Sequence, residues 1–309
     1  MLVLEQKKGF DNFEKIDRMI PFRAKSCRFK LVLGIGCECQ PFPFLLDKNG
    51  DVTVWNIAPH SHGRSFIVDR TEDGRSVVSK GNGFSYTGYT FANTGEMGNG
   101  TWGLLLEADA IRDFNLCNDV ATLGVKTNRM EYVLELECDV ILPNGKCIRP
   151  YLLQYDVECP YRISDFRFVP QEQLEAEILK WEEYNSEGYD SKHRHMIAAN
   201  VLISNLRILH DNGILHNALT SQNYTWALEL LDFELAHSPW HPYTKADYLR
   251  HVPDLYAREI FQTYNIIVEI AQILSEDFNY FEINGLFAKY GFDLNKFNVR
   301  IIYHTEKLK

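Results

Sequence analysis

Short apolar, β-rich runs separated by polar turn residues fill most of the first half of the chain and predict β-strands. The runs with this pattern are Arg28–Gly34, Asp51–Trp55, Ser65–Asp69, Ser76–Ser79, Met130–Leu142 and Cys147–Tyr155. Asn-Gly and Asp-Gly pairs at 49–50, 73–74 and 144–145 separate several of these runs, which is typical of hairpin turns. One stretch, Leu104–Leu123, instead carries apolar residues at helical spacing and is followed by Gly124, so we expect a single helix there.

Beyond Pro170 the period changes from strand-like to helical. The predicted helices are Gln171–Glu183, Ser191–His210, Tyr256–Leu274 and Phe281–Tyr290. A strand-rich half followed by a helical half indicates an α+β fold with two lobes. We therefore expect a strand-rich N-lobe over residues 1–160, a helical C-lobe over residues 161–309, and a join near Pro160–Pro170.

Composition and charge narrow the function classes. The 309 residues are 45% hydrophobic and 24% charged, as in ordinary globular proteins. The net charge of −10 argues against nucleic acid or an anionic membrane as a partner. No apolar run approaches the roughly 20 residues that a membrane-spanning helix needs, and the first residues carry charges where a secretory signal would be apolar. The seven cysteines form no C-x-x-C pair, so we expect reduced thiols and a cytoplasmic protein.

The stretch Ile214–Ala236 carries the most informative motif. Asn223 follows His216 by seven residues, and a short β-like run, the predicted strand Tyr224–Leu231, then leads to Asp232-Phe233-Glu234. This order is typical of the catalytic and metal-binding loops of kinase-like enzymes. An amide oxygen and a carboxylate are suitable ligands for Mg²⁺, and a hairpin would bring Asn223 and Asp232 to one rim of an inter-lobe cleft. The alternative is a buried hairpin in which the two side chains only cap turns.

A second motif lies in the strand-rich half. Lys80 ends a predicted strand and precedes a glycine-rich turn with Gly81 and Gly83, and Asp113 lies on the predicted helix. In kinase-like lobes a strand lysine pairs with an acidic residue of such a helix and contacts phosphates. We therefore expect an ion pair between Lys80 and Asp113, with Glu107 as the alternative partner. A surface lysine and a solvated helix face would be the structural alternative.

Together, the motifs resemble those of the selenoprotein O family of kinase-like AMP-transferases. The family pattern LKGSG-x-TPYSR, G-R-A-V-L-R-S-S-I-R-E-F, LG-[IV]-PTTR is matched in order by SKGNGFSYT, GLLLEADAIRDF and LGVKTNR. The family segment C-R-V-A-P-S-H-I-R-F-G has its counterpart in YRISDFRFV, and H-G-V-M-N-T-D-N followed by I-D-Y-G resembles His216–Asn223 and Leu231–Glu234. The resemblance covers about residues 50 to 240.

The resemblance implies a role for each matched residue. Lys80, Arg162 and Arg167 would contact the phosphates of an inverted ATP, beside Gly81 and Gly83 of the glycine-rich turn. Asn223 and Asp232 would hold Mg²⁺. The implied activity is transfer of AMP from Mg-ATP to a hydroxyl of a protein or small molecule.

Three positions depart from the family pattern. Gln222 replaces the acidic residue before the metal-binding asparagine, and an amide cannot act as a general base. Asp113 replaces a glutamate, and Glu234 stands where a glycine is usual. Gln222 would then position the acceptor hydroxyl without taking its proton. Two alternatives stay open: a pseudokinase that binds nucleotide or acts as a scaffold, and a small-molecule phosphotransferase.

Other candidate residues give weaker evidence for a functional site. His60 and His62 have no third ligand at suitable spacing, so we interpret them as loop histidines. His193 and His195 are expected to be exposed. Gly34-Ile35-Gly36 lacks the third glycine of a dinucleotide-binding turn.

Overall fold

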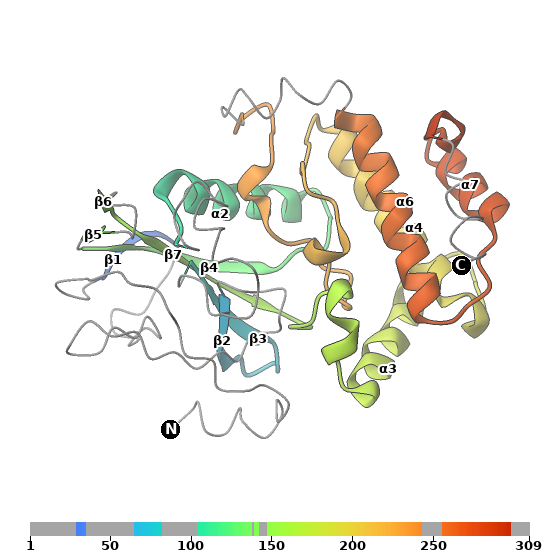
Figure 1. The fold of residues 1–309 in the computed structure, drawn as a ribbon, viewed down its shortest axis with the longest axis horizontal. Helices are drawn as coiled ribbons and strands as arrows, with labels where there is room; N and C mark the ends of the chain where they lie inside the picture. Colours follow the sequence, from blue (N-terminus) through green and yellow to red (C-terminus); the bar gives the residue numbers. More distant parts are fainter. Residues whose placement is uncertain are drawn as a thin grey trace. The chain divides into compact units, whose positions relative to one another are not determined.

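The computed structural model describes residues 29–34, 65–81, 104–137, 139–141, 147–242 and 255–297 (Figure 1). It is a mixed α+β structure, as predicted. Residue contacts divide the chain into a first unit, Met1–Asn118 with Thr127–Pro160, and a second unit, Asp119–Lys126 with Tyr161–Lys309. The division falls at Pro160, although residues 119–126 group with the second unit and not with the strand-rich half to which the sequence assigned them.

A five-stranded antiparallel sheet forms the framework of the first unit. Its strands are β1 (Phe29–Gly34), β2 (Ser65–Arg70), β3 (Ser76–Lys80), β4 (Arg129–Leu136) and β7 (Tyr151–Val157), in the order β1-β4-β7-β3-β2. Every residue of β3 and β7 is buried, which suits strands in the interior of the sheet. β2 and β3 form the hairpin that Asp73-Gly74 predicted, with Gly74 at a φ of +84°.

Two predicted strands are each broken into shorter pieces. The predicted run Met130–Leu142 is β4 followed by β5 (Val140–Ile141), and Cys147–Tyr155 is β6 (Cys147–Ile148) followed by β7. β5 and β6 pair with each other as a separate two-stranded ribbon. Pro150 lies between β6 and β7, and proline, which has no N–H, interrupts a strand ladder. The predicted strand Asp51–Trp55 lies outside the described residues.

The helix of the first half is shorter than predicted at its beginning. α2 spans Glu107–Thr122, whereas the periodicity began at Leu104. Leu104 and Leu105 are buried but extended, and the Tyr151 N–H donates to the Leu105 carbonyl at 2.9 Å. The helical spacing of apolar residues therefore extended across two buried residues that are not helical, of which Leu105 pairs with Tyr151 of β7. Gly124, with a φ of +90°, follows the helix as predicted.

The second unit is mostly helical. Its long helices are α3 (Gln171–Lys180), α4 (Arg194–Asp211), α6 (Leu255–Ile273) and α7 (Tyr280–Lys289), close to the predicted ranges. α4 packs against both α6 and α7, and Figure 1 shows α4 and α6 running side by side. Short 3-10 segments occupy Ile163–Phe168, Ser221–Asn223 and Phe233–Leu235. Among the described helices, none combines the length and apolar character needed to cross a bilayer.

One sequence expectation about this unit is wrong. His195 is only 1% exposed and bonds through Nδ1 to the carboxylate of Glu276, which also accepts from the Arg194 and His195 N–H groups. The residues after α6 cover this end of α4, and the ring of Phe278 lies against His195. Local periodicity could not show this cover, because it comes from residues about 80 positions away. His193 is exposed, as expected.

Candidate functional site

Lys80 and Asp113 form a buried ion pair in the first unit. Lys80 is the last residue of β3, Asp113 lies in α2, and the Lys80 Nζ to Asp113 Oδ2 distance is 2.6 Å. The two side chains are 2% and 1% exposed. The predicted pair is thus present, with Asp113 and not Glu107 as the partner. The pair ties the end of a central strand to the helix of the same unit.

Gly81 follows Lys80 in a conformation that favours glycine. Its φ is +98°, and a Cβ atom there would lie 2.7 Å from the Tyr151 carbonyl oxygen and 2.9 Å from Leu105 Cδ1. The backbone turns sharply at the point where the strand lysine ends, so a larger residue would move both neighbours. Gly83, the other glycine of the predicted nucleotide-binding turn, lies outside the described residues.

In the second unit, α6 holds the beginning of the His216–Asn223 loop. Asn217 is buried with a φ of +66°, and its backbone N–H donates to Glu259 Oε1 at 2.6 Å. Its side-chain Nδ2 donates to the Leu235 carbonyl at 2.8 Å, and Arg258 donates to its backbone carbonyl. Glu259 is itself 1% exposed and lies 3.0 Å from His210 Nε2. Glu259 could not be identified as a site residue from the sequence, because its partner Asn217 is 42 residues away and no motif marks it.

His216 connects this loop to the Asp232-Phe233 segment. Its Nε2 lies 2.8 Å from the Leu231 carbonyl, so this nitrogen carries the proton, and its ring meets Phe233 edge to face with centroids 4.9 Å apart. Both rings are fully buried. The first residue of one motif therefore packs on the middle residue of the other, within a single unit.

The segment between the two motifs is a tight turn and not the predicted strand Tyr224–Leu231. Only an isolated bridge joins Tyr224 to Leu230, and Leu228 has a φ of +57°. The Thr225 N–H donates to the Glu229 carbonyl, which closes the turn at 3.0 Å. A backbone hydrogen bond nevertheless closes this turn: the Leu231 N–H donates to the Asn223 carbonyl at 2.9 Å, which places the residue before Asp232 beside Asn223.

Asp232 and Glu234 supply the carboxylates of this region. Asp232 has a φ of 68° and a ψ of 69°, a left-handed conformation that aspartate tolerates better than most residues, and it begins the short helix Phe233–Leu235. Carboxylate oxygens of Asp232 and Glu234 lie within 4.8 Å of each other. Hard oxygen donors at this spacing fit a divalent cation such as Mg²⁺. Glu234, a departure from the family pattern, is thus a further possible ligand.

Asn223, the other predicted metal ligand, is 8% exposed and held at both ends of its amide. Its Nδ2 donates to the Ala218 carbonyl at 2.9 Å, and its Oδ1 lies 3.4 Å from Arg162 Nη1. Arg162 is also buried, at 6% exposure, and its backbone N–H donates to Asp165 at 3.0 Å. The structure therefore brings a predicted phosphate ligand and a predicted metal ligand together.

Arg167 does not join Arg162. It is exposed on the same short helix, Ile163–Phe168, and its guanidinium lies over the neighbouring ring of Phe166, 5.4 Å from the centroid. The two arginines lie five positions apart, Arg162 as the N-cap and Arg167 in the last turn of this 3-10 helix, and their side chains are in different environments, one buried and one exposed.

Gln222 is exposed on the short helix Ser221–Asn223. Burial raises the pKa of Glu269 of α6, and the hydroxyl of the neighbouring Ser221 opposes this rise. The loop residues His216–Asn223 include no carboxylate; Ala218 stands where protein kinases have the aspartate of H-R-D.

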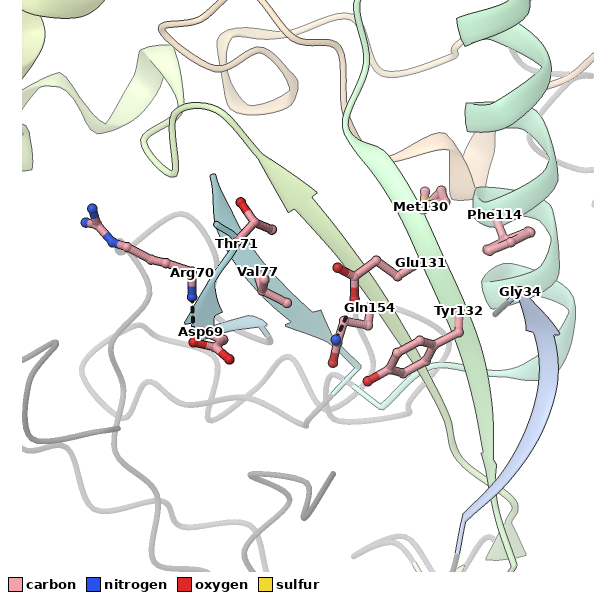
Figure 2. A pocket seen from close by; sticks show the side chains of 10 residues that line it. All are labelled: Gly34, Asp69, Arg70, Thr71, Val77, Phe114, Met130, Glu131, Tyr132 and Gln154. Atoms are coloured by element: carbon pink, nitrogen blue, oxygen red, sulfur yellow. Dashed lines mark hydrogen bonds between the residues drawn. The ribbon is translucent and has the colours of Figure 1, made fainter. Parts of the chain in front are cut away.

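A separate pocket of about 670 Å³ lies in the first unit, lined mostly by residues of the sheet and by Phe114 of α2 (Figure 2). Lys80, Gly81 and Asp113 are not among its described lining residues, whereas Gly34 is. Figure 2 shows the Glu131 and Gln154 side chains directed toward each other, and Gln154 Nε2 donates to Glu131 at 2.6 Å. Burial is the main cause that raises the pKa of Glu131, and the hydrogen bond from Gln154 opposes it.

No protein-family model matches the sequence, and no curated protein matches it either.

Proposed function

We propose that this chain is a kinase-like transferase that uses Mg-ATP and transfers AMP to a hydroxyl of a protein or small molecule. The buried Lys80–Asp113 pair is the observation that carries the proposal. A lysine and an aspartate without water around them are costly to keep, and replacing such a pair by apolar residues is often neutral or stabilising. A cation held at a strand end beside a glycine turn is, in contrast, well suited to contact phosphates.

The proposal gives each unit its own task. In the first unit, Lys80 contacts phosphate and Asp113 orients it. In the second unit, Asn223 and Asp232 would hold Mg²⁺, with Glu234 in reach of the same ion, and Arg162 neutralises phosphate charge. Bound Mg²⁺ supplies charge neutralisation at the phosphates, which is the main requirement of in-line transfer. Gln222 orients the acceptor hydroxyl by a hydrogen bond. The proton of that hydroxyl leaves to solvent, because an amide cannot act as a base.

The pseudokinase alternative is favoured by one observation. No residue from His216 to Asn223 has a carboxylate, so both positions that carry a base in kinase-like loops lack one. In that case the chain binds nucleotide but catalyses no transfer.

The deciding experiment incubates the pure chain with Mg²⁺ and ATP labelled at either the α or the γ phosphate. AMP transfer leaves the α label on the acceptor and releases pyrophosphate, whereas phosphate transfer leaves the γ label and releases ADP. Because the acceptor is unknown, both released products are measured directly. We expect pyrophosphate, and we expect Asp232→Ala to abolish it. ADP release alone would indicate a phosphotransferase, and ATP binding with neither product would indicate a pseudokinase.

A further inference from the structure

Two segments far apart in the sequence fix Arg162 beside Asn223. The Ile163 N–H donates to the Tyr224 carbonyl at 2.8 Å, and the Trp226 N–H donates to the Tyr161 carbonyl at 3.0 Å. These bonds flank an antiparallel bridge between Arg162 and Thr225. The backbone of Arg162 is thus held against the residues that follow Asn223, within the second unit. This backbone pairing positions the Arg162 side chain next to that of Asn223, so their contact does not depend on two mobile surface side chains meeting.

The contact uses the atom that a metal would need. Asn223 Oδ1 is the oxygen of the amide, and Arg162 Nη1 lies 3.4 Å from it, while the amide nitrogen is already engaged by Ala218. An amide oxygen has two lone pairs, so this contact leaves one lone pair for a cation but holds that oxygen beside Arg162. A divalent cation on Oδ1 would also stand close to a buried guanidinium, and like charges at short range in a poorly solvated site repel strongly.

A phosphate group changes this balance. Guanidinium–phosphate hydrogen bonds are charge-assisted and often bidentate, so a phosphate is a much better partner for Arg162 than a neutral amide. We infer that Arg162 couples the two ligands: the metal binds weakly at Asn223 until an anionic phosphate draws the guanidinium away and neutralises it. The inference rests on the proposed function, since it assigns a binding order to the same residues. By linkage, the metal must strengthen phosphate binding by the same factor.

The first test measures Mn²⁺ binding by electron paramagnetic resonance, with and without adenosine monophosphate, which chelates Mn²⁺ only weakly. In the wild-type chain we expect the nucleotide to raise Mn²⁺ affinity by about 5-fold or more. In Arg162→Met, Mn²⁺ should bind more tightly without nucleotide, and the nucleotide should add little. Equal Mn²⁺ affinity with and without nucleotide in the wild-type chain would overturn the inference.

A double-mutant cycle separates the specific contact from a general change of charge. Arg167→Met removes the same charge five residues away on the same short helix and should change Mn²⁺ affinity much less than Arg162→Met. In an Asn223→Ala background the gain in Mn²⁺ affinity from Arg162→Met should disappear, because the amide oxygen that Arg162 contacts is absent. An equal gain in both backgrounds overturns the inference. Arg162→Lys, which keeps the buried charge, replaces Arg162→Met if that variant does not fold, and should show a smaller gain in the same cycle.

The outcomes distinguish this inference from the proposed function. Release of pyrophosphate from ATP by a chain whose Mn²⁺ affinity does not respond to nucleotide would leave the transferase intact and refute the coupling. Coupled Mn²⁺ and nucleotide binding without any product would support the coupling in a pseudokinase. Absence of Mn²⁺ binding in every form, with and without nucleotide, refutes both the coupling and the metal site.

Discussion

Glu259 of α6 accepts a hydrogen bond from the backbone N–H of Asn217 at 2.6 Å, where Asn217 is held in a left-handed conformation. Since Glu259 also bonds His210, Glu259→Ala would leave two buried donors without this acceptor. We expect a loss of about 2–6 kcal/mol in unfolding free energy, the sum of two such penalties of about 1–3 kcal/mol each. Glu259→Gln keeps one acceptor oxygen and should lose clearly less. Hydrogen exchange at the Asn217 amide reads the contact directly: unchanged protection in Glu259→Ala would show that the bond does not hold the loop.

Lys80 and Asp113 offer a test in which function and stability separate. Lys80→Met leaves a buried carboxylate without its cation and should destabilise the chain by about 3–5 kcal/mol. Adding Asp113→Leu removes that charge as well and should recover most of the stability, while ATP binding stays lost because Lys80 is absent. Chemical unfolding and equilibrium ATP binding measure the two effects. If the double variant regains ATP affinity, Lys80 does not contact the nucleotide.

The fold followed from the sequence where local pattern and burial agree. β3 and its hairpin turn were predicted, because strand period, Asp73-Gly74 and Lys80 all lie within a few residues. The beginning of α2 was not, since Leu105 pairs with Tyr151 and the periodicity of buried residues hides this change of conformation. The breaks in the two predicted strands were not predicted either. Side-chain burial alone cannot show whether a buried leucine lies in a helix or beside a strand.

The site was predictable as separate motifs but not as a network. Lys80 and Asp113 were paired from the sequence because a recurrent pattern joins strand and helix. Glu259 and the Arg162–Asn223 contact were not, because each depends on segments 42 and 61 residues apart and on backbone bonds that no spacing rule encodes. The prediction that His195 is exposed was wrong for the same reason, because the residues that cover it follow α6, about 80 positions away.

Glu131 provides a pH-dependent prediction in the first unit. Burial raises its pKa above the ordinary 4.5, so the folded state holds the proton more tightly than the unfolded state does. Its contribution to stability is therefore greatest below about pH 4.5 and is lost as the pH rises through the folded-state pKa. Glu131→Gln removes the unfavourable charge and still accepts from Gln154. The melting temperature should rise by about 2 °C at pH 7 and change little at pH 4.

The control for this prediction is Glu137→Gln, which changes the same charge at an exposed position just beyond the same strand. It should shift the melting temperature less than Glu131→Gln does at pH 7. A Glu131→Gln variant that is less stable at pH 7 than the wild-type chain would show that the carboxylate is held by contacts stronger than its burial cost.

Gln222 is the position at which the sequence departs most consequentially from the family it resembles. It is exposed at the end of the loop and precedes Asn223, which is buried. If the missing carboxylate limits the chemistry, Gln222→Asp should restore a base and raise the transfer rate by about 10²–10⁴-fold. ATP affinity should change little, because an exposed side chain outside the Arg162–Asn223 contact does not hold phosphate. Gln222→Asn, which shortens the side chain in the same way without a charge, is the matched control.

A competing view predicts the opposite result from the same pair of variants. Phosphoryl-type transfer passes through a loose transition state, in which the attacking hydroxyl needs orientation more than loss of its proton. Gln222 would then already provide the orientation by hydrogen bonding, and both shortened variants would lose activity together. A pseudokinase would show no product in any form. Single-turnover rates under saturating Mg-ATP separate these cases, since only a catalytic defect at Gln222 makes Gln222→Asp faster than wild type while Gln222→Asn is slower. Equal rates for the two variants would refute general-base loss as the limit, because only the aspartate variant carries a carboxylate that could take the proton.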